Sequence, residues 1–157
     1  MIKRLMDITV SAVGLIVFFP LLLPITIAVW MYDWHSPFYV AERVGRGGRL
    51  FRMIKLRSMV VNRSTVDSTA ADDPRITPIG RFIRRYKIDE LSQLLNVLKG
   101  DMSLVGPRPN VKRETDLYTA EEKKLLTVNP GITDLASIVF FRRRRYSCRP
   151  ERSGYRL

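Results

Sequence analysis

The sequence predicts an α+β fold that is mainly helical, with an N-terminal membrane helix, a small β-hairpin and amphipathic surface helices. Three observations predict this fold. One apolar stretch near the N-terminus is long enough for a bilayer, two apolar runs flank a glycine-rich turn, and later segments carry apolar residues at helical spacing. The chain has 157 residues, which is enough for a modest core.

The net charge of +12 would suggest a nucleic-acid partner if it were spread over the whole chain. Half of this charge is concentrated near the C-terminus, because residues 141–157 contain seven arginines and one acidic residue. The remaining excess suits a cationic face toward anionic lipid or a polyphosphate substrate equally well. We therefore expect no nucleic-acid partner. The single cysteine, Cys148, excludes a disulfide within the chain.

The apolar stretch from Ile8 to Trp30 contains no charged residue. Four interpretations compete: a cleaved signal peptide, a straight spanning helix, a re-entrant helix and the buried core helix of a soluble domain. Pro20 and Pro24 predict a kink or break in its middle. Basic residues on both flanks favour the cytoplasmic face for both ends. The sequence therefore favours a proline-broken re-entrant membrane helix within residues 1–35.

A β-hairpin is expected next, with strands at Phe38–Val44 and Leu50–Leu56 on either side of the turn Gly45–Gly48. The turn lacks the lysine and hydroxyl residue that follow the glycines of a phosphate-binding loop. Lys55 and Arg57 lie two residues apart at the end of the second strand, so both are expected on one face of it.

Two amphipathic helices follow a polar loop at residues 62–75. Thr77 and Pro78 predict the start of the first, with threonine as N-cap and proline in the first turn. Gly100 predicts the end of the second. Helical spacing predicts one apolar stripe on each helix. The stripes are Ile79, Phe82, Ile83 and Tyr86 on the first, expected to be buried, and Leu91, Leu94, Leu95 and Leu98 on the second.

Two shorter signals lie toward the C-terminus. Thr119 and Glu122 are spaced as a capping box that starts a short helix. The sequence Asn129–Gly131 predicts a turn.

The acid pair Asp89 and Glu90 has two interpretations. Acidic residues are common in the first turn of a helix, where they complement its dipole. A reaction centre would need cations as well, and Arg84 lies five residues upstream while Arg108 lies between two prolines. Arginine suits phosphate oxygens, and Mg²⁺ typically takes one or two carboxylates plus substrate phosphate oxygens. Spacing alone leaves both interpretations open. Asn96 and Asp101 either support such a site or are only helix-end residues, and the sequence favours the helix-end interpretation.

Four segments together carry a resemblance to a known family. In chain order they read KLRSM, DPRITPIGRFIRR, IDELSQLLNVLKGDMSLVGPRP and NPGIT. From Met1 to about Phe140, the chain resembles the bacterial sugar transferases, which are small monotopic phosphoglycosyl transferases that act on polyprenyl phosphate. The resemblance also implies a proline-broken re-entrant helix at Pro20, although Phe19 stands where many members have serine.

The resemblance implies transfer of a sugar-1-phosphate from a UDP-sugar to undecaprenyl phosphate, with release of UMP. This would be the first membrane step in making a surface glycan, such as an exopolysaccharide, capsule, O-antigen or glycoprotein glycan. It implies a bacterial inner membrane protein whose active site lies on the cytoplasmic face. The expected partners are the UDP-sugar, undecaprenyl phosphate and the lipid bilayer, and the oligomeric states left open include a homodimer.

The same resemblance assigns roles to individual residues. Asp89 matches the nucleophile that forms a covalent aspartyl phospho-sugar intermediate, and Glu90 matches the residue that holds Mg²⁺. Four basic residues match positions expected to bind substrate phosphate: Lys55, Arg57, Arg84 and Arg108.

Residues 141–157 depart from the family pattern, with four consecutive arginines. We expect a membrane helix at 1–35, a catalytic domain on the cytosolic face at 36–140, and an atypical tail that reflects a frameshift or truncation. A native basic tail that binds anionic lipid is the other interpretation. Two alternatives to an active enzyme follow: an inactive truncated relative, and a basic membrane-anchored binding protein indifferent to Asp89.

Overall fold

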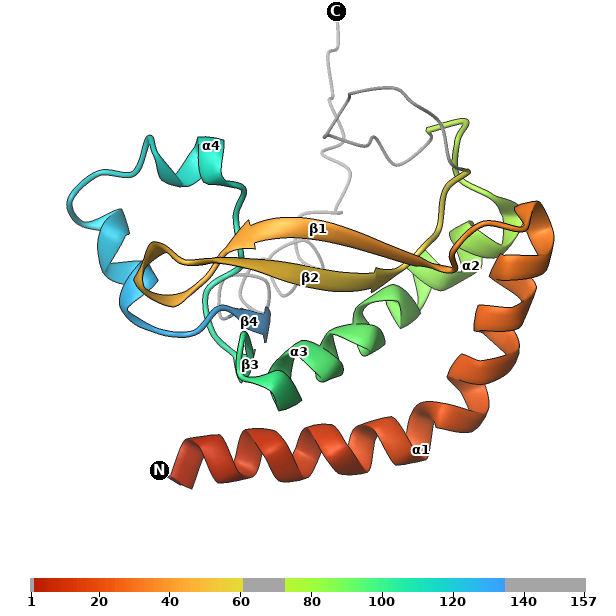
Figure 1. The fold of residues 1–157 in the computed structure, drawn as a ribbon, viewed down its shortest axis with the longest axis horizontal. Helices are drawn as coiled ribbons and strands as arrows, with labels where there is room; N and C mark the ends of the chain where they lie inside the picture. Colours follow the sequence, from red (N-terminus) through yellow and green to blue (C-terminus); the bar gives the residue numbers. More distant parts are fainter. Residues whose placement is uncertain (1, 61–72, 135–157) are drawn as a thin grey trace, which may run out of the picture.

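The computed structural model describes residues 2–60 and 73–134. A two-stranded hairpin crosses the middle of the molecule, α3 lies beneath it, and α1 runs along the lower edge (Figure 1). The predicted tail at 141–157 and most of the predicted loop at 62–75 lie outside the described residues. The division of the chain at residues 35 and 140 stays a prediction.

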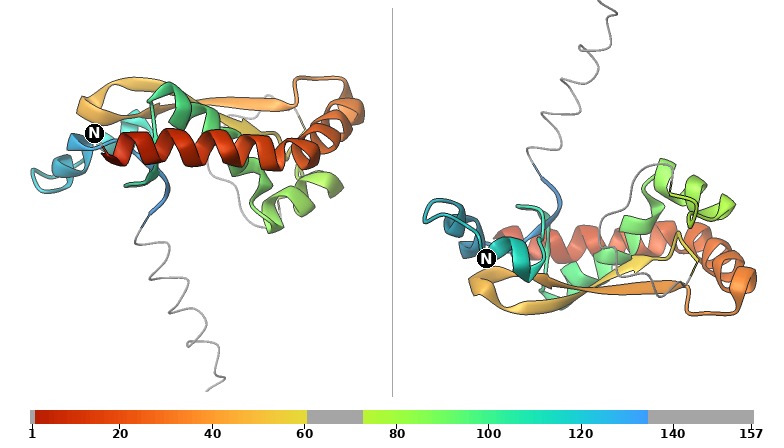
Figure 2. Two further views of the ribbon diagram at one scale, coloured as in Figure 1. Left: turned by 90° about the horizontal axis from the view of Figure 1, so that it is seen from below. Right: turned by 90° about the horizontal axis from the view of Figure 1, so that it is seen from above.

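Helix α1 extends from Ile2 to Asp33 and contains Pro20 and Pro24. The expected break is not present as an interruption, since one helix continues across both prolines. The ribbon nevertheless bends between the part beneath α3 and the part that leads to the hairpin (Figures 1 and 2). A bend is the usual consequence of a proline that removes a backbone donor and crowds the preceding turn. By length and composition α1 could cross a membrane, and its re-entrant course stays a prediction.

The hairpin is confirmed with the predicted bounds. Strand β1 (Phe38–Val44) pairs antiparallel with β2 (Leu50–Leu56), and the register runs from Phe38 opposite Leu56 to Val44 opposite Leu50. The short 3₁₀ turn η1 (Arg46–Gly48) joins them. Gly47 and Gly48 have φ angles of 69° and 76°, a region that glycine enters without the steric cost a side chain would add.

Helix α2 (Pro78–Arg85) begins as predicted, because the side chain of Thr77 accepts a hydrogen bond of 2.8 Å from the Gly80 N–H. Its predicted buried stripe is wrong in part. Ile83 is fully buried and Ile79 partly so, but Phe82 is 50% exposed and Tyr86 is 60% exposed. Helical spacing identifies the apolar face of a helix, but the width of that face covered by other elements is decided by the tertiary packing.

The second predicted helix has two parts. A 3₁₀ segment, η2 (Ile88–Gln93), continues directly into α3 (Leu94–Lys99). Gly100 ends α3 in the left-handed region at a φ of 102°, as predicted. Of the expected stripe, Leu94 is buried, whereas Leu95 is exposed.

Two short parallel strands, β3 (Ser103–Val105) and β4 (Gly131–Thr133), form a second sheet. Between them lie α4 (Lys112–Thr115) and the 3₁₀ helix η3 (Glu122–Thr127). The capping box is confirmed, since the Thr119 N–H donates to the Glu122 carboxylate at 2.8 Å and the Glu122 N–H donates to the Thr119 hydroxyl at 3.3 Å.

The core consists of two apolar clusters beside the hairpin. One joins β1 and β2 to α3 through Ala41, Phe51, Met53, Val97 and Met102. The other joins α1, β2, α2 and η2 through Val29, Leu56, Ile83 and Ile88. Each fully buried aliphatic side chain stabilises the fold by about 1.5–3 kcal/mol. The second cluster fixes the distal part of α1 against the helices that follow the hairpin.

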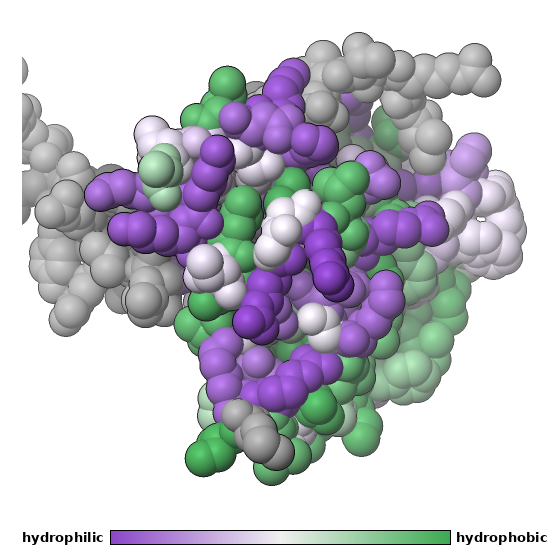
Figure 3. Space-filling model, turned by 60° about the vertical axis from the view of Figure 1, so that its left-hand side comes forward, coloured by the Kyte–Doolittle hydropathy of each residue, from purple (hydrophilic) through white to green (hydrophobic). Residues whose placement is uncertain are grey.

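Most apolar side chains of α1 face outward, as at Ile16, Val17 and Phe19. In Figure 3 hydrophobic side chains gather along the lower right, whereas hydrophilic side chains cover much of the face turned forward. A long helix with an exposed apolar surface suits contact with lipid better than contact with water.

Candidate active site

The acid pair meets a lysine from the hairpin. The Lys55 ammonium group lies 4.0 Å from an Asp89 carboxylate oxygen and 3.8 Å from a Glu90 carboxylate oxygen. Lys55 comes from β2, and both acids come from the first turn of η2. The acids therefore do lie at a helix start, but neither side chain caps it. Both carboxylates contact a cation from another element, which a simple helix start does not require.

Two polar residues of η2 and α3 hold β2 in place beside the acids. The Asn96 amide accepts from the Ile54 N–H at 3.0 Å and donates to the Arg52 carbonyl at 2.8 Å. The Ser92 hydroxyl donates to the Ile54 carbonyl at 3.1 Å. These contacts take the place of a third strand along β2 and fix the backbone next to Lys55.

The sequence alone predicted no role for Ser92, and it favoured a helix-end role for Asn96. Asn96 is almost completely buried, and a buried amide needs partners for its donor and acceptor groups. The sequence did contain one signal of this role, because Asn96 is a polar residue among the leucines of the predicted helix.

Burial is the main influence on the ionisation of Asp89. Desolvation raises the pKa of its carboxyl group, the neighbouring Glu90 carboxylate raises it further, and Lys55 and Arg84 oppose both effects. Arg84 is thus close enough for its charge to act on Asp89. The outcome is a partly desolvated carboxylate with two cations nearby, an environment in which a carboxylate is more basic and less hydrated than in water.

The position of Arg84 depends on the close packing of α2 against Ser58, which follows β2 in the chain. Its Nε donates to the Ser58 hydroxyl at 2.7 Å. Gly80 permits this packing, because a Cβ atom there would lie 1.9 Å from the Ser58 carbonyl oxygen. The glycine of the predicted helix therefore brings α2 close enough for Arg84 to contact Ser58.

Arg57 does not share the partners of Lys55. Its guanidinium pairs with the Asp33 carboxylate at the end of α1 and donates to the His35 carbonyl at 3.3 Å. Arg57 lies just beyond the last residue of β2, where strand alternation no longer sets the direction of a side chain. The observed contacts make it a link between the hairpin and α1, and its role in phosphate binding stays a prediction.

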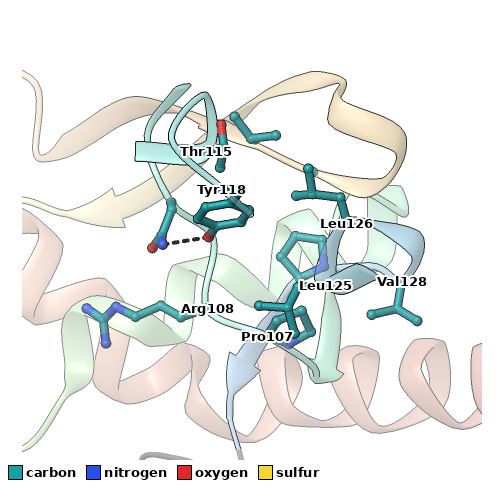
Figure 4. Close-up of a pocket in the computed structure, with 11 residues that line it drawn as sticks. Pro107, Arg108, Thr115, Tyr118, Leu125, Leu126 and Val128 are labelled. Atoms are coloured by element: carbon teal, nitrogen blue, oxygen red, sulfur yellow. Dashed lines mark hydrogen bonds between the residues drawn. The ribbon is translucent and has the colours of Figure 1, made fainter. Parts of the chain in front are cut away.

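Arg108 borders a pocket between the hairpin turn and η3. Apolar side chains including Leu125, Leu126 and Val128 line this pocket, and the Asn110 amide donates to the Tyr118 hydroxyl inside it at 2.8 Å. Figure 4 shows the Arg108 guanidinium directed away from the apolar side chains. Within residues 2–60 and 73–134, Arg108 has no hydrogen bond or ion pair, so its charge is available to an anion.

The backbone before Arg108 is fixed by two glycines in close contact. A Cβ atom on Gly106 would lie 2.4 Å from the Asn129 carbonyl oxygen, and one on Gly131 would lie 2.1 Å from the Gly106 nitrogen. The Gly131 N–H also donates to the Pro107 carbonyl at 2.9 Å. The two glycine-containing motifs are therefore one packed unit that supports the backbone before Arg108. The turn predicted at Asn129–Gly131 is wrong in part, because Asn129 and Pro130 have no assigned turn and Gly131 begins β4.

The described residues contain no group of three or more His, Cys, Asp or Glu side chains arranged for a metal ion. Asp89 and Glu90 supply two carboxylates. Since Mg²⁺ usually binds through one or two carboxylates together with substrate phosphates and water, this pair fits the expected ion.

Comparison with known proteins gives one consistent result. A family model described as bacterial sugar transferase matches residues 1–152, so the match continues past Phe140, where the resemblance was expected to end. A Bacillus subtilis protein provisionally named an undecaprenyl-phosphate N-acetylgalactosaminyl 1-phosphate transferase is 47% identical, over 84% of this chain and 71% of its own length. The exopolysaccharide production protein ExoY of Sinorhizobium fredii is 37% identical, over 87% of this chain and 68% of its own.

Other relatives are longer. The undecaprenyl-phosphate galactose phosphotransferase of Salmonella typhimurium is 42% identical over 85% of this chain, but the matched part is 32% of the relative. The chain therefore spans about a third of the length of some curated relatives that it matches.

Proposed function

The chain belongs to the bacterial sugar transferase family, and on that premise we propose that it transfers a sugar-1-phosphate from a UDP-sugar to undecaprenyl phosphate and releases UMP. The observation that carries the proposal is the meeting of Asp89 and Glu90 with Lys55, within the electrostatic reach of Arg84. This arrangement places a desolvated carboxylate among cations, which a nucleophile needs in order to approach a diphosphate.

The proposed reaction has two displacements at one phosphorus atom. An Asp89 carboxylate oxygen attacks the sugar-bearing phosphorus, and the bond from that phosphorus to the bridging oxygen breaks, so that UMP leaves with the bonding electrons. A phosphate oxygen of undecaprenyl phosphate then attacks the same phosphorus. This step breaks the bond to Asp89, restores its carboxylate and yields the lipid diphosphate sugar. Two smaller steps replace one transfer between two bulky anions.

Residues of this chain have separate tasks in these steps. Lys55 and Arg84 lower the repulsion between Asp89 and the incoming diphosphate, and Arg108, whose guanidinium has no partner among the described residues, is available to a phosphate oxygen. Glu90, with Asp89, would hold Mg²⁺, which when bound would neutralise charge on the diphosphate. Burial of Asp89 limits the water that could compete with the lipid phosphate for the phosphorus.

Helix α1 supports placement at a membrane. Its outward apolar surface suits lipid contact, and undecaprenyl phosphate keeps its phosphate at the headgroup level. We place the enzyme in the bacterial inner membrane with its active site on the cytoplasmic face, because basic residues flank both ends of the apolar stretch. The product suits the first membrane step of surface glycan synthesis.

Release of UMP tests the function directly. Protein in membranes is given Mg²⁺ and a panel of UDP-sugars, first without and then with undecaprenyl phosphate. We expect one equivalent of UMP per active enzyme without lipid and continued turnover with it. Asp89→Asn and Glu90→Gln should abolish both phases, whereas Asp116→Asn, on the exposed surface of the molecule, should change neither.

Two outcomes would refute parts of this proposal. A strict need for lipid before any UMP appears would exclude the aspartyl intermediate. No release by the unaltered chain with any UDP-sugar would indicate an inactive relative.

A further inference from the structure

The N-terminal end of α1 carries a buried acid that the proposed chemistry does not use. Asp7 is only 4% exposed. One of its carboxylate oxygens accepts from the Ser103 hydroxyl at 2.8 Å, and the other accepts from the Leu104 N–H at 3.2 Å. A buried charge is costly unless it is paired and hydrogen-bonded. An apolar helix that carries one at its contact with another element therefore indicates a specific task.

Lys3 completes this contact from the same face of α1. Its ammonium group donates to the Ser103 hydroxyl and to the Val105 carbonyl, the latter at 3.2 Å, and lies 3.9 Å from the Asp7 carboxylate. Asp7 and Lys3 thus bond to all three residues of β3. The Ser103 N–H bonds at 2.8 Å to Pro130, on the β4 side. Since successive N–H groups of a strand point to opposite edges, α1 side chains act as the partner on the other edge.

Strand β3 leads directly to the segment that presents Arg108. Gly106 follows Val105, and its backbone is packed against Gly131 with no space for a Cβ atom on either residue. Pro107 and Pro109 restrict the backbone on both sides of Arg108. A shift of β3 therefore reaches Arg108 through a short, tightly packed connection.

Arg4 provides a second link between α1 and the site. Its guanidinium donates to the Val97 and Leu98 carbonyls in the last turn of α3, the latter at 2.8 Å. Helix C-terminal carbonyls favour a cation. Because α3 continues from η2, which carries Asp89 and Glu90, the start of α1 is bonded to the element that follows the acids as well as to the strand before Arg108.

We propose that Asp7, together with Lys3, is a positioning residue for Arg108, and that the membrane helix thereby sets the place of the donor-phosphate contact. The inference rests on the proposed function, because it assigns Arg108 to the diphosphate of the sugar nucleotide. It gives the N-terminal charges of α1 a role in the protein interior, in addition to the membrane orientation that they predict. The contact between Asp7 and Ser103 could not be predicted from sequence spacing, because the two residues lie 96 positions apart in the chain.

The test compares two lysine–aspartate pairs with the same spacing. Lys3 and Asp7 form the buried pair, and Lys112 and Asp116 form an exposed pair at 2.9 Å. UMP formation is measured against UDP-sugar concentration for Asp7→Ala, Asp7→Asn and Asp116→Ala. We expect Asp7→Ala to raise KM by about tenfold, in line with the loss of a charged hydrogen-bond acceptor, with a smaller change in kcat. Asp7→Asn keeps one acceptor oxygen and should fall between, and Asp116→Ala should match the unaltered chain.

A double-mutant cycle separates positioning from general support of the fold. In an Arg108→Ala background, Asp7→Ala should have little further effect on KM, because the contact that it positions is already gone. Equal losses from Asp7→Ala with and without Arg108 would overturn the proposal. An Asp7→Ala effect no greater than that of Asp116→Ala would also overturn it.

Two measurements keep the outcome interpretable. If Asp7→Ala fails to accumulate in membranes, Ser103→Ala removes one bond to Asp7 without altering α1, and it should raise KM in the same direction. Calorimetric binding of UDP reports the phosphate contact without turnover, and Asp7→Ala should weaken it where Asp116→Ala does not. If the unaltered chain binds UDP but releases no UMP, the proposed function fails while the positioning of Arg108 is still tested by the binding data.

Discussion

The replacement Asn96→Ala is expected to destabilise the protein and to displace Lys55. Asn96 forms two hydrogen bonds with the backbone of β2, to the Ile54 N–H and the Arg52 carbonyl. Alanine leaves both backbone groups without these partners in a partly buried place. Each such loss costs about 1–2 kcal/mol, so that the free energy of unfolding should fall by about 2–4 kcal/mol. The edge of β2 is also released beside Lys55, which should lower the rate of UMP release.

The assay is denaturant unfolding of the detergent-solubilised protein, followed by tryptophan fluorescence. Asn110→Ala is the matched control, because it removes the same side chain and one bond to the Tyr118 hydroxyl. It should cost about 1 kcal/mol or less. A loss for Asn96→Ala within about 0.5 kcal/mol of the control would refute the reasoning that this amide replaces a third strand.

Three further predictions concern α2 and the site. Gly80→Ala should destabilise the protein by about 1–3 kcal/mol despite the better helix propensity of alanine, because the new methyl group meets backbone atoms; thermal unfolding measures this. Because burial raises the pKa of Asp89, the rate of UMP release should fall on acidification sooner than an ordinary aspartate would allow. Lys55→Met removes a cation that lowers this pKa, so the acidic limb of the pH–rate profile should move to higher pH. A polarity-sensitive fluorophore at Phe82→Cys, in a Cys148→Ser background, should report an apolar environment in lipid nanodiscs, since exposed aromatic residues beside a membrane helix suit the bilayer interface.

Each of these predictions has a control in the same chain. Arg81→Ala changes α2 at an exposed position and should leave the melting temperature nearly unchanged; an equal loss there would show that α2 tolerates no substitution at all. Lys99→Met removes a lysine paired with Asp101 instead of Asp89, and a pH shift equal to that of Lys55→Met would contradict the local effect. The same fluorophore at Leu117→Cys, which is 82% exposed, should report water. Identical spectra at Phe82 and Leu117 would place α2 away from the lipid.

Local signals were sufficient for the elements whose cause is local. The hairpin bounds followed from two apolar runs around glycines, the start of α2 from Thr77 and Pro78, and the capping box from Thr119 and Glu122. Each depends on residues within a few positions of one another, so the sequence contains the whole interaction. The family was also predictable, because ordered motifs along the chain carry it.

The candidate site residues come together through contacts between segments that are distant in the sequence. The sequence supplied Asp89, Glu90 and Lys55 as candidates, but only the packing of η2 against β2 brings the acids to the lysine. Arg57 pairs with Asp33 at the end of α1 instead, which strand alternation did not predict.

By itself the sequence determined the hairpin, the start of α2, the end of α3, the capping box and the family to which the chain belongs, since all of these depend on neighbouring residues or on ordered motifs. It did not predict the parallel pair of β3 and β4, which joins segments far apart in the chain. Only the tertiary structure decided that Phe82 and Tyr86 stay exposed, that Asn96 supports β2 and that Asp7 bonds to β3. The physical reason is that the burial and bonding of a side chain depend on what another part of the chain places against it. For Asp7 and Ser103 that other part is about a hundred residues away.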